Sequence, residues 1–186
     1  NIINESGNTI TIGASGDTIA LAGTTVTGIT QGITMVDQFA LTSNFSLSNG
    51  ENIITANLAR VSNGESPGFI GTGMTESSGI FTFPSTGIYM ITFNAYASSS
   101  AAALYNTRQI QVTLNNSSYA TAASSDGNFY TGTSYDSSPV QYILDVTDTA
   151  NVKVRFRIDG QGTNTTLLGN SGTNDTSFTF IRLGDT

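Results

Sequence analysis

The sequence predicts an all-β domain, built either as a sandwich or as a barrel. Short apolar segments alternate with clusters of Gly, Asn, Asp, Ser and Pro, the residues that favour turns. No segment shows sustained helical periodicity. Closely spaced strands joined by frequent turns are typical of these two architectures, and residues 79–96 add a strand that is apolar on both faces.

About ten candidate strands follow one another after residue 34. Turn residues separate most of them, and the short Ser/Ala tract 98–103 is expected to be a loop because it opens with three serines. The candidate strands are 36–47, 53–61, 69–74, 80–83, 88–97, 107–114, 119–123, 140–146, 152–158 and 177–183.

The composition excludes several classes of function. The chain has 186 residues, enough for one ordinary domain with an accessory segment, and contains neither Cys nor His. It therefore lacks disulfides, thiolate metal sites and the commonest general base. Six basic residues against thirteen acidic ones give a net charge of -7, which disfavours nucleic acid and anionic membranes as partners. No apolar run reaches the length of a membrane span, so we expect no membrane insertion.

The N-terminal region contains a short repeat. Residues 7–15 and 16–24 share Gly, Thr and Ile at their first, third and fourth places, with a period of nine residues. Each unit is predicted to form a short strand and a Gly turn, but two units cannot bury their own apolar faces. We therefore expect a fibrous β-repeat stem and connector over residues 1–33, wrapped with copies from other chains or continuing a longer upstream shaft, and a head over residues 34–186. The alternative is a frayed N-terminal arm.

Residues 79–96 contain two strands broken by a turn at Pro84 to Gly87. Neither face of the second strand is suited to water, so a strand of this kind needs a partner on each side. One partner is the facing sheet of a sandwich, and the other is expected to be a neighbouring subunit. The period of two places Ile88, Met90 and Tyr96 on one face and Tyr89, Ile91, Phe93 and Ala95 on the other.

Three motifs resemble those of one protein family. Residues 79–93, Gly-Ile-Phe-Thr-Phe-Pro-Ser-Thr-Gly-Ile-Tyr-Met-Ile-Thr-Phe, are similar to the signature G-x-F-x-x-P-x-x-G-x-Y-x-F-x-F of the globular head of complement component 1q, a branch of the tumour-necrosis-factor-like superfamily. Ile91 stands where this signature has an aromatic residue. Residues 140–154 resemble the family's strand pair L-x-L-x-x-G-D-x-V-x-V, and residues 176–183 resemble its last strand, S-x-F-x-G-x-L-L. The likeness extends over residues 35–185.

The resemblance implies a ten-stranded jelly-roll sandwich that assembles as a homotrimer on a fibrous stalk. The surplus apolar face of residues 88–96 would then pack against adjacent protomers. In the alternative arrangement, these side chains face the second sheet of their own subunit. The trimer-interface candidates are Tyr89, Ile91, Phe93, Phe178 and Phe180, or the opposite-face neighbours of the first three.

The repeat at residues 7–19 carries a second resemblance. It is similar to repeats in structural proteins of marine tailed bacteriophages, where such repeats precede a variable tip domain. Together the two resemblances imply a non-enzymatic virion structural protein, a fibre or knob on the tail or capsid. It would lie on the particle surface, contact other virion proteins through its stem, and attach to the host surface through its knob. The alternative is a secreted complement-like head of cellular origin that binds carbohydrate or protein.

No group of residues is expected to carry catalysis. A Ser nucleophile needs a base, and the chain has no His. Asp145, Asp148 and Asn151 supply oxygens around one turn, which makes them weak candidates for a calcium site, but they match no defined calcium motif. Asp at such a junction is favoured for local hydrogen bonds, so we expect no cofactor.

Two groups of residues are candidates for receptor contact. Lys153, Arg155 and Arg157 lie on one face of a strand and form a cationic stripe in an acidic protein. Three roles stay open for the stripe: contact with an anionic host polysaccharide, pairing with acidic groups of a neighbouring subunit, or a solvated outer face. Aromatic rings stack on sugars and anchor protein contacts, which gives a second group. Its members are Phe129, Tyr130 and Tyr135.

Overall fold

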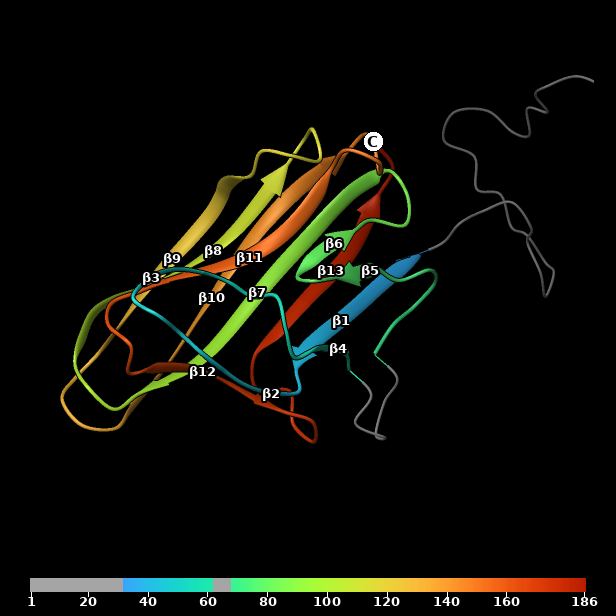
Figure 1. Ribbon diagram of the computed structural model, residues 1–186. Coiled ribbons are helices and arrows are strands. Elements are labelled where there is room, and N and C mark those ends of the chain that lie inside the picture. The colour runs from blue at the N-terminus through green and yellow to red at the C-terminus, as the bar shows by residue number, and fades with distance from the viewer. Residues whose placement is uncertain (1–31, 62–67) are drawn as a thin grey trace, which may run out of the picture. The chain divides into compact units, whose positions relative to one another are not determined.

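The computed structural model describes residues 32–61 and 68–186. They contain thirteen β-strands and no helix, so this part of the chain has no helix long and apolar enough to cross a membrane. The strands form two antiparallel sheets that pack face to face (Figure 1), which confirms the all-β prediction. The predicted stem and connector, residues 1–33, lies outside the described residues except for its last two.

The two sheets form the two layers of the sandwich, and we call them sheet I and sheet II. Sheet I contains β1 (Met35–Leu41), β2 (Ser43–Ser46), β4 (Leu58–Arg60), β7 (Gly87–Ser99), β10 (Ser134–Val146), β12 (Thr165–Asn170) and β13 (Ser177–Gly184). Sheet II contains β3 (Gly50–Ile53), β5 (Thr75–Ser77), β6 (Ile80–Thr82), β8 (Ala103–Thr113), β9 (Ala120–Phe129) and β11 (Lys153–Gly160).

Sheet I is built around β7. This strand pairs with β10 along one edge over its whole length and with β13 and β12 along the other edge. Strand β13 pairs in turn with β1, so the first and last strands of the described head are neighbours. In sheet II, β11 lies between β8 on one side and the short strands β3 and β6 on the other. Such pairings between strands far apart in sequence are typical of a jelly roll, which confirms the predicted fold class.

The observed strands differ from the predicted ones at a few places. The predicted run 36–47 is divided into β1 and β2, and the run 53–61 contains only the last residue of β3 and all of β4. The chain changes its pairing partner within both runs. Residues 69–74 contain only an isolated bridge, at Ile70. Strands β5 and β12 are absent from the sequence-based prediction, because β5 has no apolar residue and the two leucines of β12 are adjacent, which gives no alternation.

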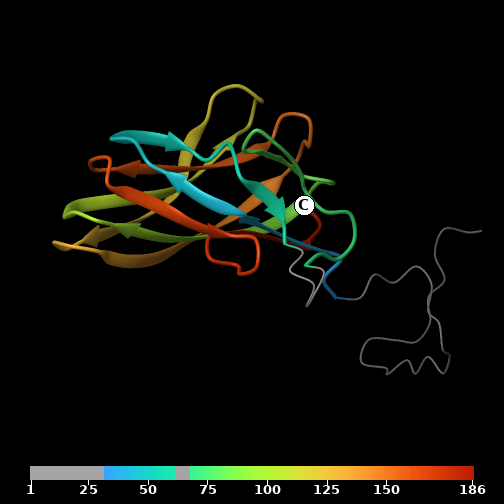
Figure 2. The same ribbon diagram turned by 60° about the horizontal axis from the view of Figure 1, so that its bottom comes forward.

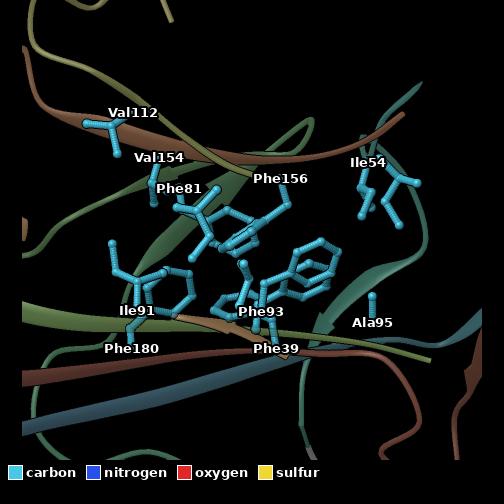
Figure 3. Close-up of a cluster of buried hydrophobic side chains, with 14 of the residues drawn as sticks. Phe39, Ile54, Phe81, Ile91, Phe93, Ala95, Val112, Val154, Phe156 and Phe180 are labelled. Atoms are coloured by element: carbon cyan, nitrogen blue, oxygen red, sulfur yellow. The ribbon is translucent and has the colours of Figure 1, made fainter. Parts of the chain in front are cut away.

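Phenylalanine side chains from both sheets form the centre of the core (Figure 3). The ring centroid of Phe156 in sheet II lies 4.5 Å from that of Phe178 and 5.2 Å from that of Phe93, both in sheet I. Phe81 of sheet II lies 5.1 Å from Phe180 of sheet I. Aromatic pairs at these distances contribute about 0.5–1.5 kcal/mol each beyond the burial of their area. These ring contacts therefore stabilise the packing of the two sheets.

Two residues of the segment 79–93 have clear structural roles in turns and in the core. Gly79 has a φ of +81°, and a Cβ at this position would collide with the carbonyl oxygen of Ile54, so only glycine fits. The ring of Tyr89 lies 4.7 Å from that of Phe83, and its hydroxyl donates to the carbonyl oxygen of Ser85 in the turn (2.9 Å). The buried tyrosine thus has its polar atom satisfied, as burial requires.

Candidate assembly and attachment surfaces

The predicted trimer-interface residues lie in the core of a single chain. They pair across β7 and β13 and face sheet II, as the contact between the Phe93 and Phe156 rings shows (Figure 3). The prediction that they contact neighbouring protomers is wrong, because a side chain without exposed area cannot reach another subunit. They face the second sheet of their own subunit instead. Tyr89, Ile91, Phe93, Phe178 and Phe180 are all 0% exposed.

The opposite face of sheet I carries a row of apolar side chains. Strand register places Met90 between Ile143 and Ile181. Ile181 lies beside Val36, and an isolated bridge adds Ile70 next to Val36. Ile143 is 61% exposed and Ile70 is 54% exposed, while the three residues between them are half-buried. We call these five residues the apolar row.

The next row of this face is polar, and its side chains bond to one another. Gln141 donates through Nε2 to Thr92 Oγ1 (3.3 Å). Gln38 donates through Nε2 to Thr179 Oγ1 (2.8 Å) and accepts at Oε1 from Asn174 (2.7 Å). None of these side chains is charged, and each has at least one hydrogen bond to a neighbouring side chain. This part of the face can therefore be covered by another surface at a low desolvation cost.

Two tyrosines extend the same face towards one end of the sandwich. Tyr135 of β10 is 62% exposed and stacks on Tyr96 of β7, with ring centroids 5.9 Å apart and planes inclined by 28°. Tyr96 lies on the same side of β7 as Met90, because the two are separated by an even number of residues. Tyr135, a predicted receptor contact, is therefore placed on the outward face of sheet I.

Four loops meet at the end of the sandwich opposite the start of β1. Met35 at the start of β1 pairs with Arg182, which pairs with Tyr89 near the start of β7. Strand β7 then runs the length of sheet I to Ser99, where these loops begin, and the loops and the start of β1 lie on opposite sides in Figures 1 and 2. We call them the distal loops. They comprise residues 47–50, 99–105, 128–135 and 160–165.

Hydrogen bonds between the distal loops hold them to one another. The N–H of Leu104 donates to Oε1 of Gln161, which joins the β7–β8 loop to the β11–β12 loop. The N–H of Gly162 donates to Oδ1 of Asn49 (2.8 Å), which joins the β11–β12 loop to the β2–β3 loop. The cluster is thus a connected surface built on strand ends rather than four independent loops.

The distal loops expose several large side chains. Leu104 is 82% exposed, Tyr130 is 79% exposed and Tyr105 is 42% exposed. The receptor-contact role of Tyr130 stays a prediction that its exposure permits. Phe129 is only 4% exposed, because it pairs with Ala103 and packs in the core. The prediction that Phe129 contacts a receptor is therefore wrong.

The cationic stripe on β11 is occupied by partners within the chain. Lys153 is buried and donates through Nζ to the carbonyl oxygen of Thr149 (2.6 Å). Arg157 forms ion pairs with Glu51 and Asp159. Lys153 therefore has a hydrogen-bond partner within the chain, and Arg157 has two ion-pair partners, before any ligand approaches.

Arg155, the third member of the stripe, is held between an amide and an aromatic ring. Its Nε donates to Oε1 of Gln111 (2.8 Å), and its guanidinium carbon lies 4.1 Å from the centroid of the Tyr119 ring. Burial raises the pKa of the Tyr119 hydroxyl, and the nearby guanidinium opposes that rise. These contacts disfavour the stripe as a binding site for an anionic receptor.

The weak metal candidates form a turn. Asp148 accepts hydrogen bonds from the N–H of Ala150 (2.8 Å) and from Nδ2 of Asn151 (2.6 Å), and these bonds lower the pKa of its carboxyl, the Ala150 bond most. Asp145 lies apart on β10, exposed and paired with Ile88. Across the described ranges, no three acidic, His or Cys side chains gather as metal ligands. The geometry is that of local turn chemistry.

Sequence reasoning missed most of the apolar row and the exposed Leu104. Ile143 stands within an apolar run of β10, so the alternation that would have marked it as outward-facing is weak. Ile181 alternates with the buried Phe178 and Phe180, which is a usable signal. Leu104 follows a run of alanines, and nothing in its sequence context indicates exposure.

Comparisons with known proteins bear on the fold. No protein-family model matches the sequence, and no curated protein matches it. Among solved structures, murine APRIL at pH 8.5 is similar, with a TM-score of 0.55, 13% identity, and coverage of 80% of this chain and 98% of that chain. Murine APRIL at pH 8.0 and at pH 5.0 gives the same TM-score and coverage at 12% identity. The likeness confirms the predicted tumour-necrosis-factor-like jelly-roll fold.

Proposed function

We propose that this chain is a non-enzymatic virion structural protein, a trimeric fibre or knob of a tailed bacteriophage that attaches the particle to the host surface. The jelly-roll head supports the knob, and the repeats at residues 7–15 and 16–24 support the fibre. In this proposal, residues 1–33 join the knob to other virion proteins on the tail or capsid. The sequence contains neither His nor Cys, which supports a role without catalysis.

The apolar row on sheet I is the observation that carries the self-association. Single-chain soluble proteins seldom expose contiguous apolar surface, and larger patches mark contact sites. The row crosses sheet I from β10 to β1 and reaches the segment at Ile70. In a closed ring, every copy meets its neighbours in the same way, so the apolar row would be covered on each copy. Each Å² of apolar area covered is worth about 25 cal/mol.

Two further groups of residues on the same face support this assembly. The polar row has no charged side chain, and each of its side chains already has a hydrogen-bond partner. The stacked Tyr96 and Tyr135 add aromatic surface at the distal end of the face. The trimeric state and the complement 1q-like branch of the fold are proposed from the sequence resemblance. The structural roles of the signature residues Gly79 and Tyr89, described above, support that resemblance.

The distal loops are the proposed attachment surface. The chain enters the described head at the start of β1, and these loops lie at the opposite end of β7. In this proposal, it is these loops that meet the host surface. Tyr130 and Leu104 are the most exposed large side chains there, and such residues anchor contacts with sugars and proteins.

Light scattering coupled to size-exclusion chromatography tests the assembly. At low micromolar concentration, the full chain should give a mass close to three times the 19.4 kDa of one chain. A mass near 19.4 kDa would reject the trimer. Mass spectrometry of purified virions and immunogold labelling test the location. The chain should be found in the particles with gold at the fibre ends, and its absence from particles would reject the virion role.

A further inference from the structure

The distal loops contain no charged residue. Their sequences are Leu-Ser-Asn-Gly, Ser-Ser-Ala-Ala-Ala-Leu-Tyr, Asn-Phe-Tyr-Thr-Gly-Thr-Ser-Tyr and Gly-Gln-Gly-Thr-Asn-Thr. The charged residues next to these loops, Glu51, Asp136 and Asp159, form ion pairs with Arg157 and Arg108. The loops themselves are therefore uncharged, which is relevant to the kind of surface they can approach.

The exposed groups of the distal loops are aromatic or aliphatic side chains beside amides and hydroxyls. Tyr130 and Leu104 are highly exposed, and Tyr105, the residue after Leu104, is exposed to a smaller degree. Pyranose rings present apolar C–H faces and hydroxyl edges, so they are bound by ring stacking together with amide and hydroxyl hydrogen bonds. The exposed polar side chains of these loops are Ser48, Asn49, Ser100, Asn128, Thr131, Thr133, Thr163 and Asn164.

The distal loops are also held in place before any ligand binds. Beyond the two bonds described above, the N–H of Ser100 donates to the carbonyl oxygen of Asn164 (3.2 Å). Pairing of Ala103 with Phe129 ties the β7–β8 loop to the β9–β10 loop. A surface that is ordered in advance loses less conformational entropy on binding, and this matters for the weak contacts that sugars make.

We propose that the distal loops bind a neutral polysaccharide, with Tyr130 and Leu104 as the main contacts. This inference rests on the proposed attachment function and specifies its ligand class. An acidic polysaccharide would need cationic partners for its carboxylates or sulfates, and the distal loops supply none, while the net charge of -7 repels it. The cations of β11 are engaged by their own chain, as Arg157 is by Glu51.

A polysaccharide panel on biosensor surfaces tests the proposal with the full chain. The panel contains neutral dextran, mannan and galactomannan, with dextran sulfate and alginate as anionic counterparts. We expect binding to at least one neutral polymer and weaker binding to the anionic ones. The Leu104→Ala, Tyr130→Ala double variant should lose that binding by about tenfold or more, whereas Tyr130→Phe, which keeps the ring, should stay within about twofold.

The matched control is Leu114→Ala. Leu114 is an apolar residue with 69% exposure, and it follows the end of β8 that lies away from the distal loops. This variant should bind as the parent chain does. Binding confined to the anionic polymers, no binding to any neutral polymer, or unchanged binding by the double variant would each overturn the proposal; a protein receptor would give the second of these results.

Light scattering on the same samples separates this inference from the proposed function. If the parent chain keeps three times the mass of one chain but binds no neutral polymer, the ligand class is wrong and the assembly stands. If its mass is that of one chain, the assembly is wrong whatever the panel shows. The double variant should keep the mass of the parent chain, because its residues lie outside the apolar row.

Discussion

Arg108 of β8 forms an ion pair with Asp136 of β10 and so joins the two sheets through a fully buried guanidinium. The side chain of Arg108 has no exposed surface, while that of Asp136 is 22% exposed. Burial lowers the pKa of Arg108, and the charge of Asp136 opposes that change. Gly127 of β9 makes room for the pair, because a Cβ there would collide with the Asp136 carboxylate and the Arg108 guanidinium.

Asp136→Ala should destabilise the head strongly. The change leaves the buried charge of Arg108 without its counter-ion, and breaking a buried pair in this way costs about 3–5 kcal/mol. Urea denaturation followed by circular dichroism measures the loss. The matched control is Asp185→Ala, since Asp185 pairs with Arg182 but its side chain is 91% exposed. That variant should change the free energy of unfolding by less than about 1 kcal/mol. Equal losses in the two variants would contradict the role given to the buried pair.

Gly127→Ala should act on the same ion pair through space rather than charge. The added methyl group must displace Asp136 or Arg108, and overpacking of this kind costs about 1–3 kcal/mol. Gly172→Ala is the control, because its Cβ would meet only Oδ1 of Asn170, at 3.5 Å. Thermal unfolding of the two variants gives the comparison. If Gly172→Ala lowered the unfolding temperature more than Gly127→Ala, the Arg108–Asp136 pair would have to move aside at little cost.

Asp37→Asn should loosen the segment that leads to β5. Asp37 is fully buried and accepts hydrogen bonds from Nε and Nη2 of Arg60 (2.8 and 2.9 Å) and from the N–H of Met74 (2.7 Å). The bond with Asp37 is the main reason that the pKa of Arg60 is raised. Loss of the charge weakens all these bonds, at a cost of about 1–3 kcal/mol. Hydrogen exchange at Met74 should therefore become faster. Unchanged protection there would mean that the carboxylate charge does not hold the segment.

The fold was predictable because its signals are local. Turn residues between short apolar runs identify strands without knowledge of their partners. One segment of the sequence also contains both Gly79, which stands in a turn, and Tyr89, whose hydroxyl bonds to the next turn. The candidate interface was placed on the wrong face for a related reason. A period of two defines two faces of β7 but does not say which one faces sheet II when both are apolar. The bulky rings of Tyr89 and Phe93 fill the core, which leaves Met90 outside.

The buried ion pair was beyond the reach of sequence patterns. Arg108 has the same parity along β8 as the buried Ile110, which hints at an inward direction. A charged residue at such a position still requires a partner, and Asp136 lies on a strand of the other sheet. Pairing between sheets depends on the packing of the whole sandwich. No spacing within one segment encodes it.

Ile143→Asp and Phe93→Asp should fail in different ways. Phe93 has no exposed area, and its ring centroid lies 5.1 Å from that of Phe178, so a carboxylate there must enter the core. That variant should lose its β-sheet circular dichroism or become insoluble. Ile143 is 61% exposed in the apolar row, so Ile143→Asp should keep the sheet signal while its mass by light scattering falls towards 19.4 kDa. Ser124→Asp, at an exposed position on β9 of sheet II, is the control and should keep the parent mass. If Ser124→Asp lowers the mass as much as Ile143→Asp does, the assembly surface is not the outward face of sheet I.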